Sequence, residues 1–231
     1  VWRSLAGLGR TIGFLAIMPG ICSCVTMNTG LTATTVGKGN TEIGLQPSAV
    51  DINPGGGAES LVGEIWGMKG VTDHLDLGGS AGTNGLTFRT RYRLSPSNEE
   101  NSVVAIAPSV GGGGFPALFF NYHYEIPILI GFPFGRGHEI VFIPKYLQVG
   151  GTWGLKDTGQ VCGHLFASGL EIGLSLELAH RFAVHPNFAM VAPIANMGTA
   201  DVMGQSFRFE GETPETGITK QISIGFVFGG E

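Results

Sequence analysis

Ten ionisable side chains alternate with apolar residues along several segments of the chain, which makes them the first candidates for chemistry. They are Asp76, Arg89, Arg91, Arg93, Glu125, Glu139, Lys145, Glu171, Glu177 and Arg181. Alternate residues of an extended strand share one face, and this set holds five acidic and five basic groups. Because an unpaired charge away from water is costly, the balance predicts an ion-paired interior. The alternative is an arginine ladder that lines a pore and selects anions.

The six histidines predict neither a metal site nor a catalytic centre. None of them has the spacing of a zinc motif such as HExxH. His123 and Glu125 share a face two residues apart, but no convincing serine partner accompanies them. Residues 111–114 are consecutive glycines that lack the lysine and the following helix of a phosphate-binding loop. We therefore expect no enzyme activity, no metal and no cofactor.

An Asn-Gly pair at residues 84–85, between two alternating segments, predicts the hairpin that sets the faces of the sheet. Asn-Gly favours a type I′ turn, which needs φ > 0 at both central residues. A two-residue loop at this point places Asp76 opposite Arg93. The apolar row then lies on one face and the charged row on the other, and a slip of one residue would destroy both rows.

Ten segments show the period-two alternation of β-strands, and no helical period occurs after the N-terminus. The expected strands cover residues 34–46, 60–68, 74–83, 86–95, 102–111, 118–132, 138–149, 165–182, 187–197 and 218–228. In one of the clearest, Leu170, Ile172 and Leu174 share a face opposite Glu171 and Gly173.

The composition separates a soluble sheet protein from a membrane barrel. Charged residues make up 13% of the 231 residues, about half the usual share of a soluble domain, and 39 residues are glycine. The expected connections alternate between short turns and longer loops, such as residues 150–164 and 198–217, as in outer-membrane barrels. We therefore predict an all-β fold, an antiparallel up-and-down transmembrane β-barrel of about ten strands, with eight or twelve as alternatives. The net charge of −5 gives no electrostatic basis for nucleic-acid binding.

The first residues have the pattern of a signal peptide. A segment with Arg3 and Arg10 leads into a short apolar stretch at residues 11–18. The sequence ICSC at residues 21–24 resembles a bacterial lipobox, which implies acylation of Cys24, with Cys22 as the alternative. The predicted organisation is a lipoprotein-type signal peptide over residues 1–23, an N-terminal tether over residues 24–33 and the barrel over residues 34–231.

Two stretches, GVTDHLDLGGSAGTNGL at residues 70–86 and GRGHEIVFIPKY at residues 135–146, resemble small Gram-negative outer-membrane β-barrel proteins. The resemblance implies a bacterial outer-membrane location, contact with outer-membrane lipid and insertion by the barrel assembly machinery. Such barrels usually end in an aromatic residue, whereas three further residues follow Phe228 here. The aromatic residues expected at the membrane interfaces are Trp66, Trp153, Tyr122, Tyr124, Tyr146 and Phe134.

These patterns favour a non-enzymatic outer-membrane lipoprotein barrel with a structural or lipid- and partner-interaction role and a largely closed lumen. A small porin-like diffusion channel for ions or polar solutes is the alternative. A lipid-modifying outer-membrane enzyme is the least favoured class. Gly- and Ala-rich outward positions permit a homo-oligomer without requiring one.

Overall fold

The computed structural model describes residues 29–51, 59–83, 85–96, 101–115, 119–155, 159–202, 205–212 and 218–229. All regular structure in these residues is β-strand. The strands are β1 (Thr41–Asp51), β2 (Glu59–Gly70), β3 (Leu75–Gly82), β4 (Gly85–Arg93), β5 (Val103–Ile106), β6 (Ser109–Phe115), β7 (Phe119–Phe134), β8 (His138–Leu155), β9 (Gly159–Ala179), β10 (Phe182–Val202), β11 (Gln205–Glu212) and β12 (Thr219–Gly229). The part of the chain that the structure describes holds no helix long and apolar enough to cross a membrane.

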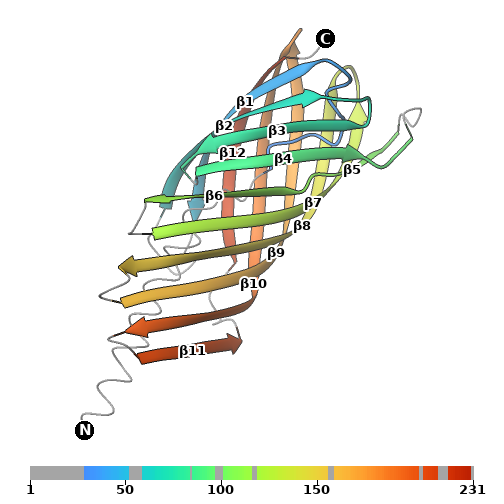
Figure 1. The fold of residues 1–231 in the computed structure, drawn as a ribbon. Coiled ribbons are helices and arrows are strands. Elements are labelled where there is room, and N and C mark those ends of the chain that lie inside the picture. Colours follow the sequence, from blue (N-terminus) through green and yellow to red (C-terminus); the bar gives the residue numbers. More distant parts are fainter. Residues whose placement is uncertain are drawn as a thin grey trace.

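The strands form one antiparallel sheet that closes on itself (Figure 1). β12 pairs with β1 and with β10, and β10 also pairs with β9, which completes the ring. β5 and β6 both lie between β4 and β7 as two halves of one strand, while β11 and β12 both pair along β10. The predicted antiparallel barrel of ten strands is therefore confirmed, with β11 as an addition.

The alternation along each strand explains both faces of the barrel. In β12, Ile222 and Ile224 are 61% and 46% exposed on the outer face, whereas Gln221 and Ser223 are 0% and 2% exposed in the lumen. A soluble sheet has the opposite polarity, since it buries its apolar row. The outer surface is therefore that of a barrel of the outer-membrane type, which turns apolar side chains to lipid.

The hairpin of β3 and β4 has the predicted faces, but the predicted pairing is wrong. Gly82 pairs with Gly85, and Asp76 pairs with Arg91 instead of Arg93. Gly82 and Gly85 are thus the last paired residues of the hairpin, and Gly85 is already a strand residue with a φ of +100°. Glycine adopts this φ without a steric penalty, so it can end the turn as well as occupy its centre. Moving the loop by one residue moves the pairing by two, so the inward residues remain inward.

One side of the barrel is much taller than the other. β8, β9 and β10 have 18, 21 and 21 residues, whereas β3 and β4 have 8 and 9. Figure 1 shows the long strands and β11 extending away from the rest of the ring. The predicted loops at residues 150–164 and 198–217 are largely paired strand, because β8 pairs with β9 and β10 with β11 across them. Their small and polar residues lack the apolar alternation of the other strands, yet the ladders satisfy their backbone groups.

The outward apolar row of β9 gives a direct test of which face meets lipid. Ile172 is 41% exposed in this row, and Ser168 is an exposed residue on the same face, beyond the end of the row. Ile172→Arg should destabilise the barrel in lipid by about 2–4 kcal/mol, because an outward arginine is most costly near the midplane. Ser168→Arg should cost about 0–1 kcal/mol, as expected near an interface. Folding yields in lipid vesicles, measured by the heat-modifiable gel shift, compare the two, and equal yields would contradict the lipid-facing surface.

Candidate functional site

The lumen holds seven of the ten charged residues expected there. Asp76, Arg89, Arg91, Glu125, Glu139, Lys145 and Glu171 are each at most 5% exposed. The other three lie at the end of the barrel that carries the turns at residues 71–74, 135–137 and 180–181, here called the short-turn end. Arg93 is half-buried there, and Glu177 and Arg181 are exposed. Arg181 forms part of the turn between β9 and β10 with a φ of 66°, and both Glu177 and Arg181 lie at the mouth of the cavity at this end.

Two arginines of β4 form ion pairs with carboxylates of β1, β2 and β3. Arg91 Nε lies 2.7 Å from Asp76 Oδ2 on β3, and Arg91 Nη2 lies 3.3 Å from Glu42 Oε2 on β1. Arg89 pairs with Glu64 of β2. Glu42 and Glu64 are not among the residues expected in the lumen, because the inward residues beside them are uncharged and the alternation does not show which face is polar.

Lys145 of β8 lies between two carboxylates. Its Nζ is 2.9 Å from Glu171 Oε2 and 3.2 Å from Glu125 Oε1. With Glu139, the described residues that face the lumen include six carboxylates and three buried basic side chains. The lumen therefore lacks the equal balance of acids and bases expected from the sequence, and a buried carboxylate without a donor is costly.

Residues 29–36, here called the plug, lie inside the barrel and supply further donors. The N–H and the hydroxyl of Thr29 donate to Glu171 Oε2 at 3.0 and 2.9 Å. The N–H of Ala33 donates to Glu139 Oε1 at 3.0 Å. Arg89 Nη1 in turn donates to the carbonyl oxygen of Thr29 at 3.0 Å. The plug thus bonds to both signs of charge on the lumen wall.

The ion pair of Asp76 and Arg91 also contacts the plug on both of its members. The N–H of Val36 donates to Asp76 Oδ2 at 3.0 Å, and Arg91 Nη1 donates to the carbonyl oxygen of Thr32 at 3.1 Å. Hydrogen bonds that involve a charged group are roughly twice as strong as neutral ones. The plug and the luminal ion pairs therefore form one hydrogen-bonded unit.

Apolar contacts of the plug close the lumen at the same level. Leu31 and Ala33 are 5% and 0% exposed, and they belong to one cluster with Leu129 and Ile143, which are both 0% exposed. Gly131 of β7 makes room for this contact, because a Cβ at that position would lie 2.8 Å from the Cβ of Ala33. The space between the plug and the wall is therefore filled by protein.

The position of the plug differs from the predicted tether and first strand. The sequence assigns residues 24–33 to a tether and begins a strand at residue 34, whereas residues 29–33 are buried or half-buried in the lumen and β1 begins at Thr41. A segment of Thr, Gly and Ala residues suits a solvated tether and a plug equally well. Only the closed ring around it decides between the two.

A cavity of about 600 Å³ lies between the plug and the short-turn end of the barrel. Its lining includes Thr32 of the plug, Arg93, Ser175 and His185. His185 Nε2 is 2.9 Å from Ser175 Oγ, and His185 Nδ1 is 3.4 Å from the carbonyl oxygen of Gly30. Both ring nitrogens of His185 thus have partners, which is the ordinary state of a buried histidine. The described residues include no group of three His, Cys, Asp or Glu side chains that could hold a metal ion.

The aromatic residues expected at the membrane interfaces divide between the two faces. Trp66 is 2% exposed and faces the lumen, so this prediction is wrong for Trp66. The physical reason is Gly44 on β1, which leaves space for the indole, since a Cβ there would lie 2.2 Å from the ring. Tyr124 and Phe134 are 38% and 42% exposed on the outer face. The side chain of Trp153 lies outside the described residues.

No family model and no curated protein matches the sequence. Among solved structures, the chain is similar to Neisserial surface protein A, with 11% identity, a TM-score of 0.39 and coverage of 82% of this chain and 95% of that chain. It is also similar to Ail, the attachment invasion locus protein of Yersinia pestis, with 10% identity, a TM-score of 0.36 and coverage of 83% and 99%. The outer membrane protein OprG from Pseudomonas aeruginosa has 9% identity, a TM-score of 0.38 and coverage of 86% and 99%. Such weak similarities say nothing about the ligands, partners or activity of this chain.

The observed pairing of Asp76 leads to a comparison of two arginines on one face of β4. Arg91→Met should lower the free energy of unfolding by about 3–5 kcal/mol, because it leaves buried Asp76 without its charge partner. Arg93→Met should cost about 1 kcal/mol, since Arg93 is half-buried at the rim and donates to Ser95 and to the carbonyl oxygen of Pro96. Denaturant unfolding in lipid vesicles measures both, and a larger loss for Arg93→Met would support the pairing predicted from the sequence.

Proposed function

We propose that this chain is a bacterial outer-membrane β-barrel protein that is closed to diffusion at rest and presents a tall β-sheet wall outside the membrane for contact with other molecules. The role is structural or interactive and not enzymatic. The wall consists of residues 150–155, 159–168 and 195–202 with β11. The observation that carries the proposal is the change in outward side chains along β9.

The outward residues of β9 define a membrane-spanning belt and a segment beyond it. Leu170, Ile172, Leu174, Leu176 and Leu178 form a continuous apolar row over nine residues. A transmembrane β-strand needs about 9–11 residues. Beyond this row the alternate residues are Ser168, Phe166, His164 and Cys162. The ten residues from 159 to 168 therefore rise about 25 Å above the belt, at 3.3 Å per residue and a strand tilt near 40°.

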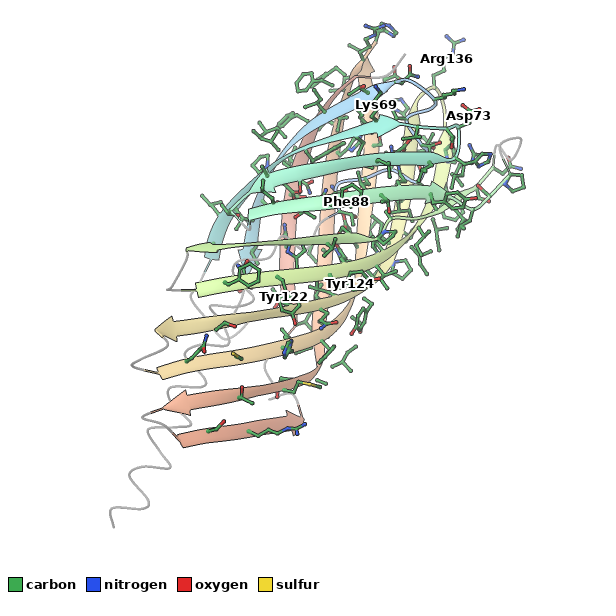
Figure 2. All side chains as sticks on the ribbon, viewed as in Figure 1. Lys69, Asp73, Phe88, Tyr122, Tyr124 and Arg136 are labelled. Carbon is green, nitrogen blue, oxygen red and sulfur yellow. The ribbon has the colours of Figure 1, made fainter. Side chains whose placement is uncertain are left out.

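An aromatic group lies on the outer face of the wall, six residues beyond Leu170 on β9. The hydroxyl of Tyr122 on β7 hydrogen-bonds to His164 Nδ1 on β9 across Gly150 of β8. A Cβ at Gly150 would lie 2.4 Å from the Tyr122 ring, so the glycine provides the surface on which the ring lies. Tyrosine with its hydroxyl in a polar contact is typical of membrane interfaces. Figure 2 shows Tyr122 and Tyr124 on neighbouring positions of the same long strand.

The opposite end of the barrel has the features of a periplasmic rim. The tight turns lie at this end, and the chain also enters β1 and leaves β12 here. The N–H of Gly39 donates to the carbonyl oxygen of Gly70, and the N–H of Gly229 donates to the carbonyl oxygen of Arg181. Outer-membrane barrels have short turns on the periplasmic side. Figure 2 shows Lys69, Asp73 and Arg136 at this end, where charged groups meet water. The wall is therefore the extracellular part.

The filled lumen supports the closed form over the porin-like alternative. Asp76 and Arg91 lie on one side of the lumen, and Leu129 and Ile143 lie on the other. All four residues are 0% exposed. A water-filled path would leave such groups accessible. The pairing of His123 Nε2 with the Thr87 hydroxyl at 3.1 Å, rather than with a nucleophile beside an open site, supports a non-enzymatic role.

The orientation can be tested with cysteines at the two ends, in a Cys162→Ser background. Thr199→Cys lies on the wall and Arg136→Cys lies in the turn between β7 and β8, and both parent residues are exposed. On intact cells, a membrane-impermeant maleimide should label Thr199→Cys and leave Arg136→Cys unlabelled. After the outer membrane is permeabilised, both variants should react. Labelling of Arg136→Cys alone on intact cells would reverse the orientation and remove the basis for an extracellular interaction role.

We further propose that Cys24 is acylated; Cys24 and its alternative Cys22 both lie outside the described residues. Five residues of extended chain span at most about 18 Å. Thr29 contacts Glu171, which is eight residues from the end of β9 at Ala179, a depth of about 20 Å. An acyl anchor in the leaflet at the short-turn end would therefore draw Thr29 away from Glu171 by a few ångströms. The bonds of Ala33 to Glu139 and of Val36 to Asp76 lie nearer that end, so they would remain and would keep the lumen closed.

Mass spectrometry of the mature N-terminus from membranes tests the lipid. The expected N-terminal residue is an acylated Cys24, because the charged segment, the short apolar stretch and the ICSC ending form a lipobox-like pattern. Cys24→Ser should abolish the mass of the lipid and leave Cys22 unmodified. A lipid on Cys22, or an unmodified mature chain, would refute acylation of Cys24.

A further inference from the structure

We propose that the plug is displaceable and that the lumen it leaves conducts cations in preference to anions. The proposal rests on the barrel spanning a membrane, as proposed above. It concerns a second state of the chain, in which residues 29–36 no longer fill the lumen.

The plug is attached by contacts that can be broken without opening the barrel. None of the strand pairings among the described residues includes residues 29–36. Its polar contacts run to side chains of the wall, among them Glu171, Glu139, Asp76, Arg89 and Arg91. Each of these side chains can turn to water or to a neighbouring charge when the plug leaves, while the ladder of the barrel stays intact.

A channel already begins at the short-turn end. The cavity of about 600 Å³ there is lined by Thr32, Thr34 and Val36 of the plug on its inner side. Gly131 and the carboxylate of Glu139 border the plug from the wall, and a Cβ at Gly131 would lie 1.8 Å from Glu139 Oε1. Removal of the plug would therefore extend the cavity into a part of the lumen lined by small and charged groups.

The charge left on the wall sets the selectivity. Six carboxylates of the described residues face the lumen, against four basic side chains: the buried Arg89, Arg91 and Lys145 and the half-buried Arg93 that lines the cavity. Arg89, Arg91 and Lys145 are each paired with at least one of those carboxylates. When the plug leaves, Glu171, Glu139 and Asp76 lose amide donors and become sites that attract cations, since rings of acidic side chains select cations in pores. The arginine ladder suggested by the sequence would select anions, but two of its arginines, Arg89 and Arg91, are paired with carboxylates.

The experiment uses the full-length chain, refolded in detergent and placed in planar bilayers under a KCl gradient. Thr29→Pro removes both donors to Glu171, and Val36→Pro removes the N–H donor to Asp76. Each lost charge-assisted bond should raise the open fraction about tenfold or more. The wild-type protein should give no conductance. The double variant should show conductance steps, and the reversal potential should have the sign expected for a channel that prefers potassium over chloride.

A disulfide provides the matched control in the double variant, with the native cysteines replaced by serine. Ala33→Cys and Gly131→Cys would place their Cβ atoms about 2.8 Å apart, which is shorter than the roughly 3.5–4.5 Å of a disulfide. The plug must therefore move about 1 Å from the wall, and the flexible Glu139 side chain, whose Oε1 lies 1.8 Å from the new Cβ, must turn aside before the bridge closes. The oxidised lock should silence the double variant, and a reducing agent should restore its conductance. The proposal would be overturned if the conductance persisted with the disulfide oxidised, if the folded double variant gave no conductance, or if the channel preferred chloride.

Two further outcomes separate this proposal from the closed resting state. A wild type that conducts, and that the oxidised lock silences, would support the displaceable plug and contradict closure at rest. If the double variant gives no heat-modifiable band, the single Thr29→Pro variant takes its place with the same lock. In the open variant, Glu139→Gln should reduce the preference for potassium over chloride, and an unchanged preference would contradict the assignment of selectivity to the luminal carboxylates.

Discussion

A carboxylate in a closed lumen needs a donor, and this barrel has more inward carboxylates than inward bases. Arg89, Arg91 and Lys145 cannot neutralise all of their acidic neighbours. The backbone of residues 29–36 provides the remaining donors, to Glu171, Glu139 and Asp76 among others, and takes two arginines on its carbonyl groups. The N-terminal segment is thus a structural component of the barrel, and the charges in the lumen explain why it lies there.

Lipid imposes the second constraint, because a strand in hydrocarbon must have every backbone group paired. The closed ring meets this demand, and apolar residues such as Ile172 and Ile222 face outward as a result. Above the belt, lipid no longer requires every backbone group to be paired. β8, β9 and β10 nevertheless continue as strands because they pair with one another and with β11. In the proposed arrangement, the same ladder serves as a membrane wall at one height and as a surface outside the membrane at another.

Glycines adapt the narrow ring to large inward and outward side chains. Gly44 leaves room for the indole of Trp66 in the lumen, Gly131 leaves room for the plug, and Gly150 supports the Tyr122 ring on the outer face. In each case the neighbouring strand contributes the large side chain and the glycine contributes the space. This pairing of small with large residues explains why a chain with 39 glycines still packs a filled barrel.

The alternation in the sequence predicts most of the strands, their two faces and the barrel, because it is a local property that survives an error of two residues in register. It placed Asp76, Arg89 and Arg91 on the inner face for that reason. It does not predict β11 or the upper ends of β8, β9 and β10, whose residues lack the apolar alternation. The tertiary structure alone decided that Asp76 pairs with Arg91, that Trp66 points inward and that residues 29–36 fill the lumen. Those outcomes depend on which strands become neighbours and on the space and charge that the closed ring encloses, and no local pattern encodes either quantity.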